Sequence, residues 1–369
     1  MLKNFLGEIM KTVKNKLRDD YPLVFESIFR KMKLSYKNGI LLCVIVLLIL
    51  HPIFYFAFFP HKYLLTMLTL YFPGYVIGAA VFLWGLKKVR DAAVTELPRV
   101  KDYLSADAQK RAEKRLKITF TLKYYIIVPL LFGLIAFIYL SRGLVGGEWR
   151  LWGDILAHNP ASIVVAWFLV FEESFLVFVV SMLGYFCIMN TAIVYLLAKN
   201  VYTERLDVLH EDKRCGLSPL VNLVFKISKI WLITVSIFIF QVVAITPIDL
   251  WISLALAASL AIAAITIFAL LPLHNIILKV KSVELSGLYR RSSKIIKGTS
   301  KCLNHGTGKT MKNLAHKITL ITFKKSELKQ VSAWPVLSTL LTIMRNIVYF
   351  SLPIFAAVLS DVVRHAFLG

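Results

Sequence analysis

Hydrophobic and polar positions fall into long blocks along this chain, and the block lengths predict membrane-spanning helices. A helix that crosses a bilayer needs roughly 20 mostly apolar residues. Apolar runs long enough for this occupy residues 40–59, 63–86, 120–140, 161–198, 220–246, 250–271 and 334–359. The pattern therefore predicts an all-α, polytopic membrane protein with seven transmembrane helices.

The run at 161–198 is the longest, and its only charged residues are the adjacent Glu172 and Glu173. As one helix it would extend roughly 57 Å, nearly twice the hydrocarbon core of about 30 Å. A hairpin of two spans is disfavoured because the run contains no proline and Gly184 is its only glycine. We therefore predict one helix that crosses the membrane and projects beyond it.

The polar blocks between the runs are strongly basic, and this sets the expected topology. The net charge is +23, and 36 of the 44 lysine and arginine residues lie in 1–38, 87–118, 199–218 and 273–333. The positive-inside rule places these segments in the cytoplasm, with the N-terminus inside and the C-terminus outside. The same charge favours anionic lipid as a partner, whereas no motif indicates nucleic-acid binding. A hydrophobic content of 58% and a mean hydropathy of +0.69 support the membrane class.

These blocks predict four regions. Residues 1–38 form a cytoplasmic amphipathic region, and 39–272 hold helices 1–6 with cytoplasmic connections at 87–118 and 199–218. Residues 273–333 form a basic helical segment, and 334–360 hold helix 7. Apolar positions after residue 271 keep helical spacing, so we expect the sixth helix to continue into a cytoplasmic subdomain. Such narrow apolar stripes need a partner surface, which favours a homo-oligomer.

Polar residues inside the predicted spans are the first candidates for function. Glu172, Glu173 and Arg345 fall near the bilayer midplane on helices 4 and 7, where an unpaired charge costs about 2.5–3.5 kcal/mol. Arg345 is therefore expected to face one of the glutamates. The other candidates for a polar interior are Asn346, Asn190 and Gln241. Three interpretations stay open: a structural ion pair, a permeation path and a proton-coupled carboxylate.

The connection at 199–218 is the densest polar cluster. Its ligand or cation candidates are Asp207, His210, Glu211 and Asp212. Two cysteines and two histidines could also complete a tetrahedral zinc shell, namely His210, Cys215, Cys302 and His305. Their spacings match no common zinc finger, and a solvated, salt-bridged loop is the simpler interpretation.

No catalytic motif is complete, so the sequence predicts no enzyme. The segment at 306–310 resembles the end of a phosphate-binding loop, but Leu303 occupies the position of its first glycine. His210 and Glu211 open like a zinc-protease motif, but Arg214 stands where the second histidine belongs. His51 and His274 are isolated in the sequence and do not indicate a haem site.

The layout alone resembles the insect odorant- and gustatory-receptor channels, with seven spans, a cytoplasmic N-terminus and large inner connections before the last span. In that family the last span lines the pore of a tetramer. The resemblance implies a homo-oligomeric ion channel of the cell membrane that passes a permeant ion. Polar residues of helices 4 and 7 are then expected near the conduction path. The alternatives are a secondary transporter with an intramembrane carboxylate and a membrane sensor or scaffold that acts through its basic cytoplasmic region.

Overall fold

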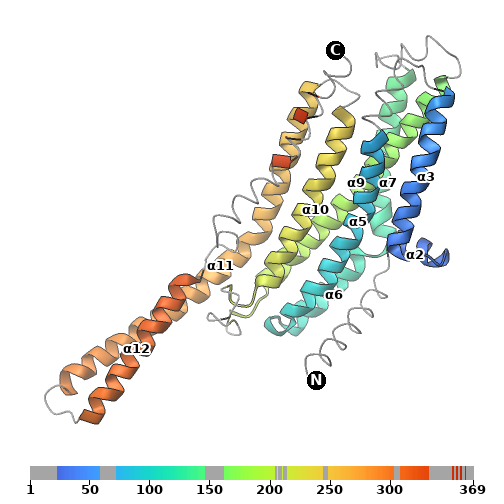
Figure 1. The fold of residues 1–369 in the computed structure, drawn as a ribbon. Helices are drawn as coiled ribbons and strands as arrows, with labels where there is room; N and C mark the ends of the chain where they lie inside the picture. Colours follow the sequence, from blue (N-terminus) through green and yellow to red (C-terminus); the bar gives the residue numbers. More distant parts are fainter. Residues whose placement is uncertain are drawn as a thin grey trace.

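A computed structural model describes residues 23–58, 72–145, 162–203, 206, 210, 214–243, 248–302 and 308–331, with scattered positions at 351–362. Figure 1 shows a bundle of long helices from which a paired arm projects. The helices are α2 (Val24–Lys31), α3 (Tyr36–Phe58), α5 (Phe72–Glu96), η2 (Leu97–Tyr103), α6 (Ala106–Thr119), α7 (Leu122–Val145), α9 (Ser162–Lys199), α10 (Ser218–Val243), α11 (Ile248–Cys302) and α12 (Gly308–Gln330).

Five of these helices are long and apolar enough to cross a membrane. Their apolar stretches are Tyr36–Ile53, Tyr125–Arg142, Ala166–Lys199, Ser218–Ile239 and Ser259–Lys297. The predicted span at 63–86 is described only from Phe72 onward, and the predicted span at 334–359 lies almost wholly outside the described residues. The structure therefore confirms a helical protein, and at predicted spans 1, 3, 4, 5 and 6 it has helices that are long and apolar enough to cross a membrane. Seven spans and the orientation of the bundle stay predictions.

Helix α9 is the central element of the bundle, and it is a single helix as the sequence predicts. It packs against α3, α5, α6, α7, α10 and α11. More than half of the apolar stretches of α9 and α10 is buried, whereas only 17% of each stretch in α3 and α7 is buried. The outer faces of α3 and α7 carry exposed leucine and isoleucine side chains such as Leu50 and Ile135. Apolar exposure of this extent is suited to lipid contact.

The charged connection at 87–118 folds as helix, as its sequence predicts. It comprises the end of α5, the short η2 and α6. Ser105 caps α6, because its Oγ accepts a hydrogen bond from Ala108 N at 3.1 Å. We call this end of the bundle, with α2, η2, α6 and the start of α10, the basic end.

Helix α11 continues far past the bundle, which confirms the predicted extension beyond residue 271. It has 55 residues and passes through Pro272 without ending, so it is roughly 80 Å long, more than twice a hydrocarbon core. Helix α12 runs back beside its far half (Figure 1). Leu288 and Leu328 are buried in the arm, and Lys281 Nζ donates to Val331 O at 2.7 Å. We call 273–302 together with α12 the arm.

Candidate functional site: a buried histidine–glutamate pair

Glu172, the carboxylate singled out in the sequence, is buried on α9 and has a histidine partner. Its Oε1 contacts Nε2 of His51, which belongs to α3. Each side chain is 4% exposed. The structure thus pairs Glu172 with a residue that the sequence left isolated. Glu173, next along α9, is only partly buried.

Three aromatic rings surround the imidazole of His51. The ring centroids of Tyr75, Phe72 and Phe168 lie 5.1, 5.5 and 5.8 Å from it. Phe72 and Tyr75 come from α5, and Phe168 lies one helical turn before Glu172 on α9. The rings keep water from the pair, so charge on one partner without the other would be costly. A proton shared between the imidazole and the carboxylate would give each group a hydrogen-bond partner in this apolar site.

The pair lies far from the basic end of the bundle. Glu172 precedes Lys199, the last residue of α9, by about 40 Å of helix. The pair links α3 to α9 and places a titratable imidazole beside a carboxylate in an apolar site. It is therefore both a structural link and a candidate proton-binding group.

Of Asn190, Gln241, Arg345 and Asn346, only Asn190 has a described side chain, and it does not reach this pair. Asn190 is fully buried, but it lies about 27 Å along α9 from Glu172, and its Nδ2 donates to Phe186 O at 2.7 Å on its own helix. Gln241 belongs to α10, but its side chain is not described. Arg345 and Asn346 lie outside the described residues. The predicted pairing of Arg345 with a glutamate stays a prediction.

The predicted ligand cluster at the basic end is described only in part. His210 is half-buried, and Cys215 is fully buried in the hydrophobic core with a φ of 57°. Outside the described residues lie Asp207, Glu211, Asp212, His305 and the side chain of Cys302. Among the residues that the structure does describe, no group of three metal-binding side chains comes together. The zinc shell and the cation site stay predictions.

Sequence reasoning missed a buried ion-pair cluster at the basic end. The Arg90 side chain is fully buried in α5 and pairs with Glu26 of α2 and with Asp91, whose Oδ1 is 3.0 Å from Nη2. A turn and a half further along α5, Glu96 is buried and accepts from Lys226 of α10 at 2.6 Å and from Arg99 at 3.0 Å. The sequence did contain a sign that Arg90 is buried, because Arg90 lies at helical spacing from apolar Leu86 and Ala93 and so shares their face of the helix.

Comparison with known proteins adds no family: no family model, no curated protein and no solved structure matches this chain. The fold and its composition therefore define the class, which is an integral membrane protein with an all-helical bundle.

Proposed function

We propose that this protein is the subunit of an oligomeric ion channel in the cell membrane, with its basic end and arm in the cytoplasm. The observation that carries the proposal is the arm. It projects beyond the bundle (Figure 1) and keeps large apolar side chains exposed, including Val283, Ile296 and Phe323 at 60, 64 and 61%. An exposed apolar surface outside lipid is typical of a protein–protein contact.

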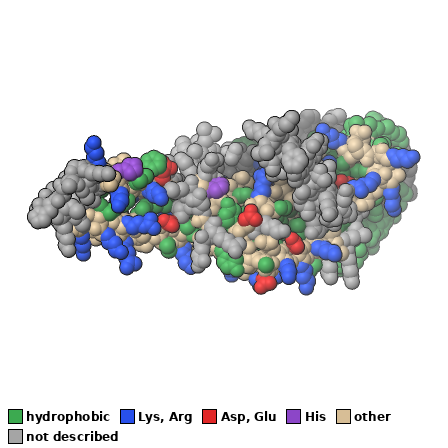
Figure 2. Space-filling view, turned by 90° about the horizontal axis from the view of Figure 1, so that it is seen from below, with side chains coloured by type: hydrophobic (Ala, Val, Ile, Leu, Met, Phe, Trp, Pro, Cys, Tyr) green, Lys and Arg blue, Asp and Glu red, His purple; other side chains and the backbone are tan. Residues whose placement is uncertain are grey.

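A second copy of the chain is the partner that fits this surface best. Closed symmetric assemblies of one chain are the commonest oligomers, and an arm that leaves the bundle can reach the arm of a neighbour. Figure 2 shows Lys and Arg side chains along the arm, and the segment 273–333 holds 13 of them against Glu284 and Glu327. Repulsion between like-charged arms then opposes the apolar contact, and salt screens that repulsion.

The packing of the subunit favours a conduction path between copies. Leu183, Val194 and Ala198 of the central helix α9 are fully buried, and such close-packed side chains leave little room for a file of water. Helix α11, in contrast, is only one-third buried along its apolar stretch. Its exposed face is available to a neighbouring copy.

Single-channel recording tests this proposal. Purified protein in planar bilayers with asymmetric KCl is expected to give unitary current steps, and the reversal potential gives the ion preference. Silent bilayers from a preparation shown to be oligomeric would contradict a channel. Glu172→Gln and Arg345→Gln, compared with wild type, test whether either charge affects the unitary current.

The second candidate is a proton-coupled secondary transporter, and the His51–Glu172 pair favours it. A buried group that takes up and releases one proton is the usual element of coupling in such proteins. In liposomes, a transporter would give saturable flux that a pH gradient drives and that Glu172→Gln abolishes. Flux that does not depend on the pH gradient, in wild type and in Glu172→Gln alike, would contradict coupling through this pair.

A further inference from the structure

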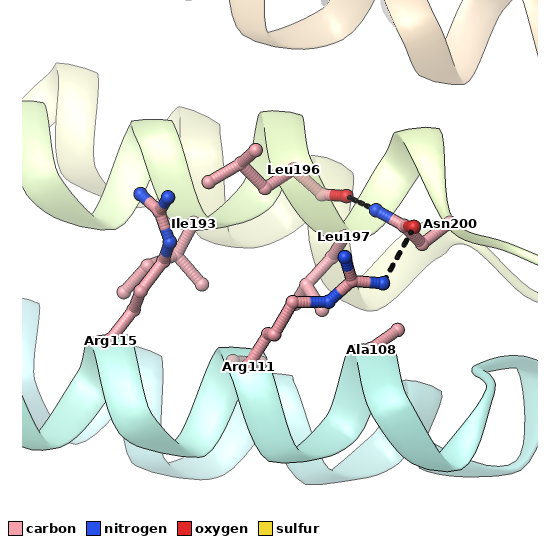
Figure 3. Close-up of a pocket in the computed structure, with 8 residues that line it drawn as sticks. Ala108, Arg111, Arg115, Ile193, Leu196, Leu197 and Asn200 are labelled. Carbon is pink, nitrogen blue, oxygen red and sulfur yellow. Dashed lines mark hydrogen bonds between the residues drawn. The ribbon is translucent and has the colours of Figure 1, made fainter.

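A groove between α6 and α9 combines two arginines with an apolar floor. It encloses about 110 Å³, several times the space that one water molecule needs. Ala108, Arg111, Ala112 and Arg115 line it from α6, and Ile193, Leu196, Leu197 and Asn200 line it from α9. Figure 3 shows both arginine side chains rising from α6 toward α9.

The two guanidinium groups differ in how they are held. Arg111 donates from Nη2 to Asn200 Oδ1 at 3.3 Å and from Nε to the carbonyl of Asp107, also at 3.3 Å. Asn200 is itself oriented, because its Nδ2 donates to Leu196 O at 2.7 Å. These two bonds hold the Arg111 guanidinium at the groove. The other N–H groups among its five stay available to a ligand. Arg115 stands one helical turn away, beside Ile193 in Figure 3.

The charge of the groove is not balanced within the part of the chain that the structure describes. There, neither arginine pairs with an aspartate or glutamate side chain. Two guanidinium groups side by side present planar N–H donors, the geometry that phosphate oxygens accept best. The apolar lining is suited to the hydrocarbon part of the same ligand.

We infer that the groove binds the phosphate headgroup of an anionic phospholipid. Its level along the bundle supports a lipid. The apolar stretch of α7 begins at Tyr125, whose ring packs on Phe186 of α9 at 5.1 Å between centroids. Ile193 lies about 10 Å further along α9, and the polar layer of a bilayer adds about 5–8 Å on each side. A long arginine side chain such as that of Arg115 spans the remaining distance. This site does not depend on whether the protein conducts ions.

Lipid titration followed by native mass spectrometry tests the inference. The full chain, purified in a non-ionic detergent, is titrated with phosphatidylglycerol or with phosphatidylcholine. Wild type is expected to bind the first phosphatidylglycerol more tightly than phosphatidylcholine. Arg111→Gln with Arg115→Gln should weaken phosphatidylglycerol binding roughly 25-fold, at about fivefold for each arginine.

A matched control lies on the same helix. Lys110 and Lys114 are exposed, carry the same charge and do not line the groove. Lys110→Gln with Lys114→Gln should leave phosphatidylglycerol binding unchanged. Equal losses in the two double variants would overturn the inference, because the whole basic surface would then attract the lipid.

Two further comparisons keep the result interpretable. Arg115→Gln alone removes no side-chain hydrogen bond between described residues, so its fold should be intact, and it should still weaken phosphatidylglycerol binding about fivefold. Inorganic phosphate at millimolar concentration is added in competition with the lipid. Displacement of phosphatidylglycerol by inorganic phosphate at equal concentration would show a simple anion site and overturn the lipid assignment.

Discussion

At the residue scale, the four buried acidic, basic or histidine side chains that the structure describes in this bundle, His51, Arg90, Glu96 and Glu172, each contact a partner of opposite charge type. His51 faces Glu172, and Arg90 faces Glu26 and Asp91. Removing one member of a buried pair leaves the other charge uncompensated, which costs about 3–5 kcal/mol, whereas replacing both members by apolar groups is often neutral. Within each cluster, a single substitution should therefore lower the stability, whereas replacing both partners should change it little.

The first prediction concerns the pair between α3 and α9. His51→Phe alone and Glu172→Leu alone should each lower the melting temperature in detergent by several degrees, because each removes one of the two buried polar groups that contact each other. The double variant should recover most of the loss. Thermal unfolding of the four proteins measures the coupling, and additive losses would show that the two side chains do not interact.

The second prediction concerns the basic end. Arg90→Met should destabilise the bundle by about 3–5 kcal/mol, because the Glu26 carboxylate loses the buried guanidinium that it contacts. Arg99→Gln is the matched control: its side chain is 48% exposed, and Glu96 keeps its hydrogen bond from Lys226, so the loss should stay within about 1 kcal/mol. Denaturant unfolding of both variants gives the comparison. A loss of unfolding free energy in Arg99→Gln as large as that in Arg90→Met would contradict the larger role given to the buried Arg90.

Only part of this chemistry could be predicted from the sequence. Glu172 stands out because a charge interrupts a long apolar run, so its importance is a local property of the chain. Its partner depends on which faces of α3 and α9 meet, and no local pattern encodes that contact. His51 looked isolated for this reason.

At the element scale, helix length was predictable and helix contact was not. The apolar run of α9 predicts one long helix because it contains no proline. The extension of α11 is predicted by apolar positions that keep helical spacing after residue 271, and α11 passes through Pro272. Close contacts depend on single small residues. A Cβ built on Gly133 of α7 would lie 2.9 Å from Phe178 Cβ and 3.3 Å from Ser174 O, both on α9.

The third prediction follows from that contact. Gly133→Ala should lower the melting temperature, because α7 must move away from α9. Gly287→Ala on α11 is the control, since a Cβ there meets nothing within 4 Å, and alanine should stabilise the helix by about 0.5–1 kcal/mol. Thermal unfolding in the same detergent distinguishes them. A stabilising Gly133→Ala would contradict the close packing of α7 on α9.

At the scale of the whole molecule, the bundle and the arm face different surroundings. Exposed apolar side chains on the outer faces of α3 and α7 are suited to lipid, whereas we propose that those of the arm lie outside it, because α11 is more than twice as long as a hydrocarbon core. From the sequence, the basic charge of 273–333 predicts that this segment lies on the inner side of the membrane. What the arm contacts could not be predicted, because an apolar stripe does not specify its partner.

The fourth prediction tests the arm as a contact between copies. Val283→Asn with Phe323→Asn should shift the protein toward monomer in size-exclusion chromatography with light scattering, because both side chains are exposed in the subunit. Ser282→Asn with Ser326→Asn adds polar groups at neighbouring exposed positions and should leave the oligomer intact. If both double variants elute as the intact oligomer, the contact between copies does not involve Val283 and Phe323.

The most direct test of the central claim is the mass of the wild-type particle released from lipid nanodiscs, measured by native mass spectrometry at low and high salt. The account predicts a fixed multiple of the subunit mass, and a larger oligomeric fraction at high salt, where repulsion between the basic arms is screened. A monomer at every salt concentration would contradict an oligomeric channel built through the arm.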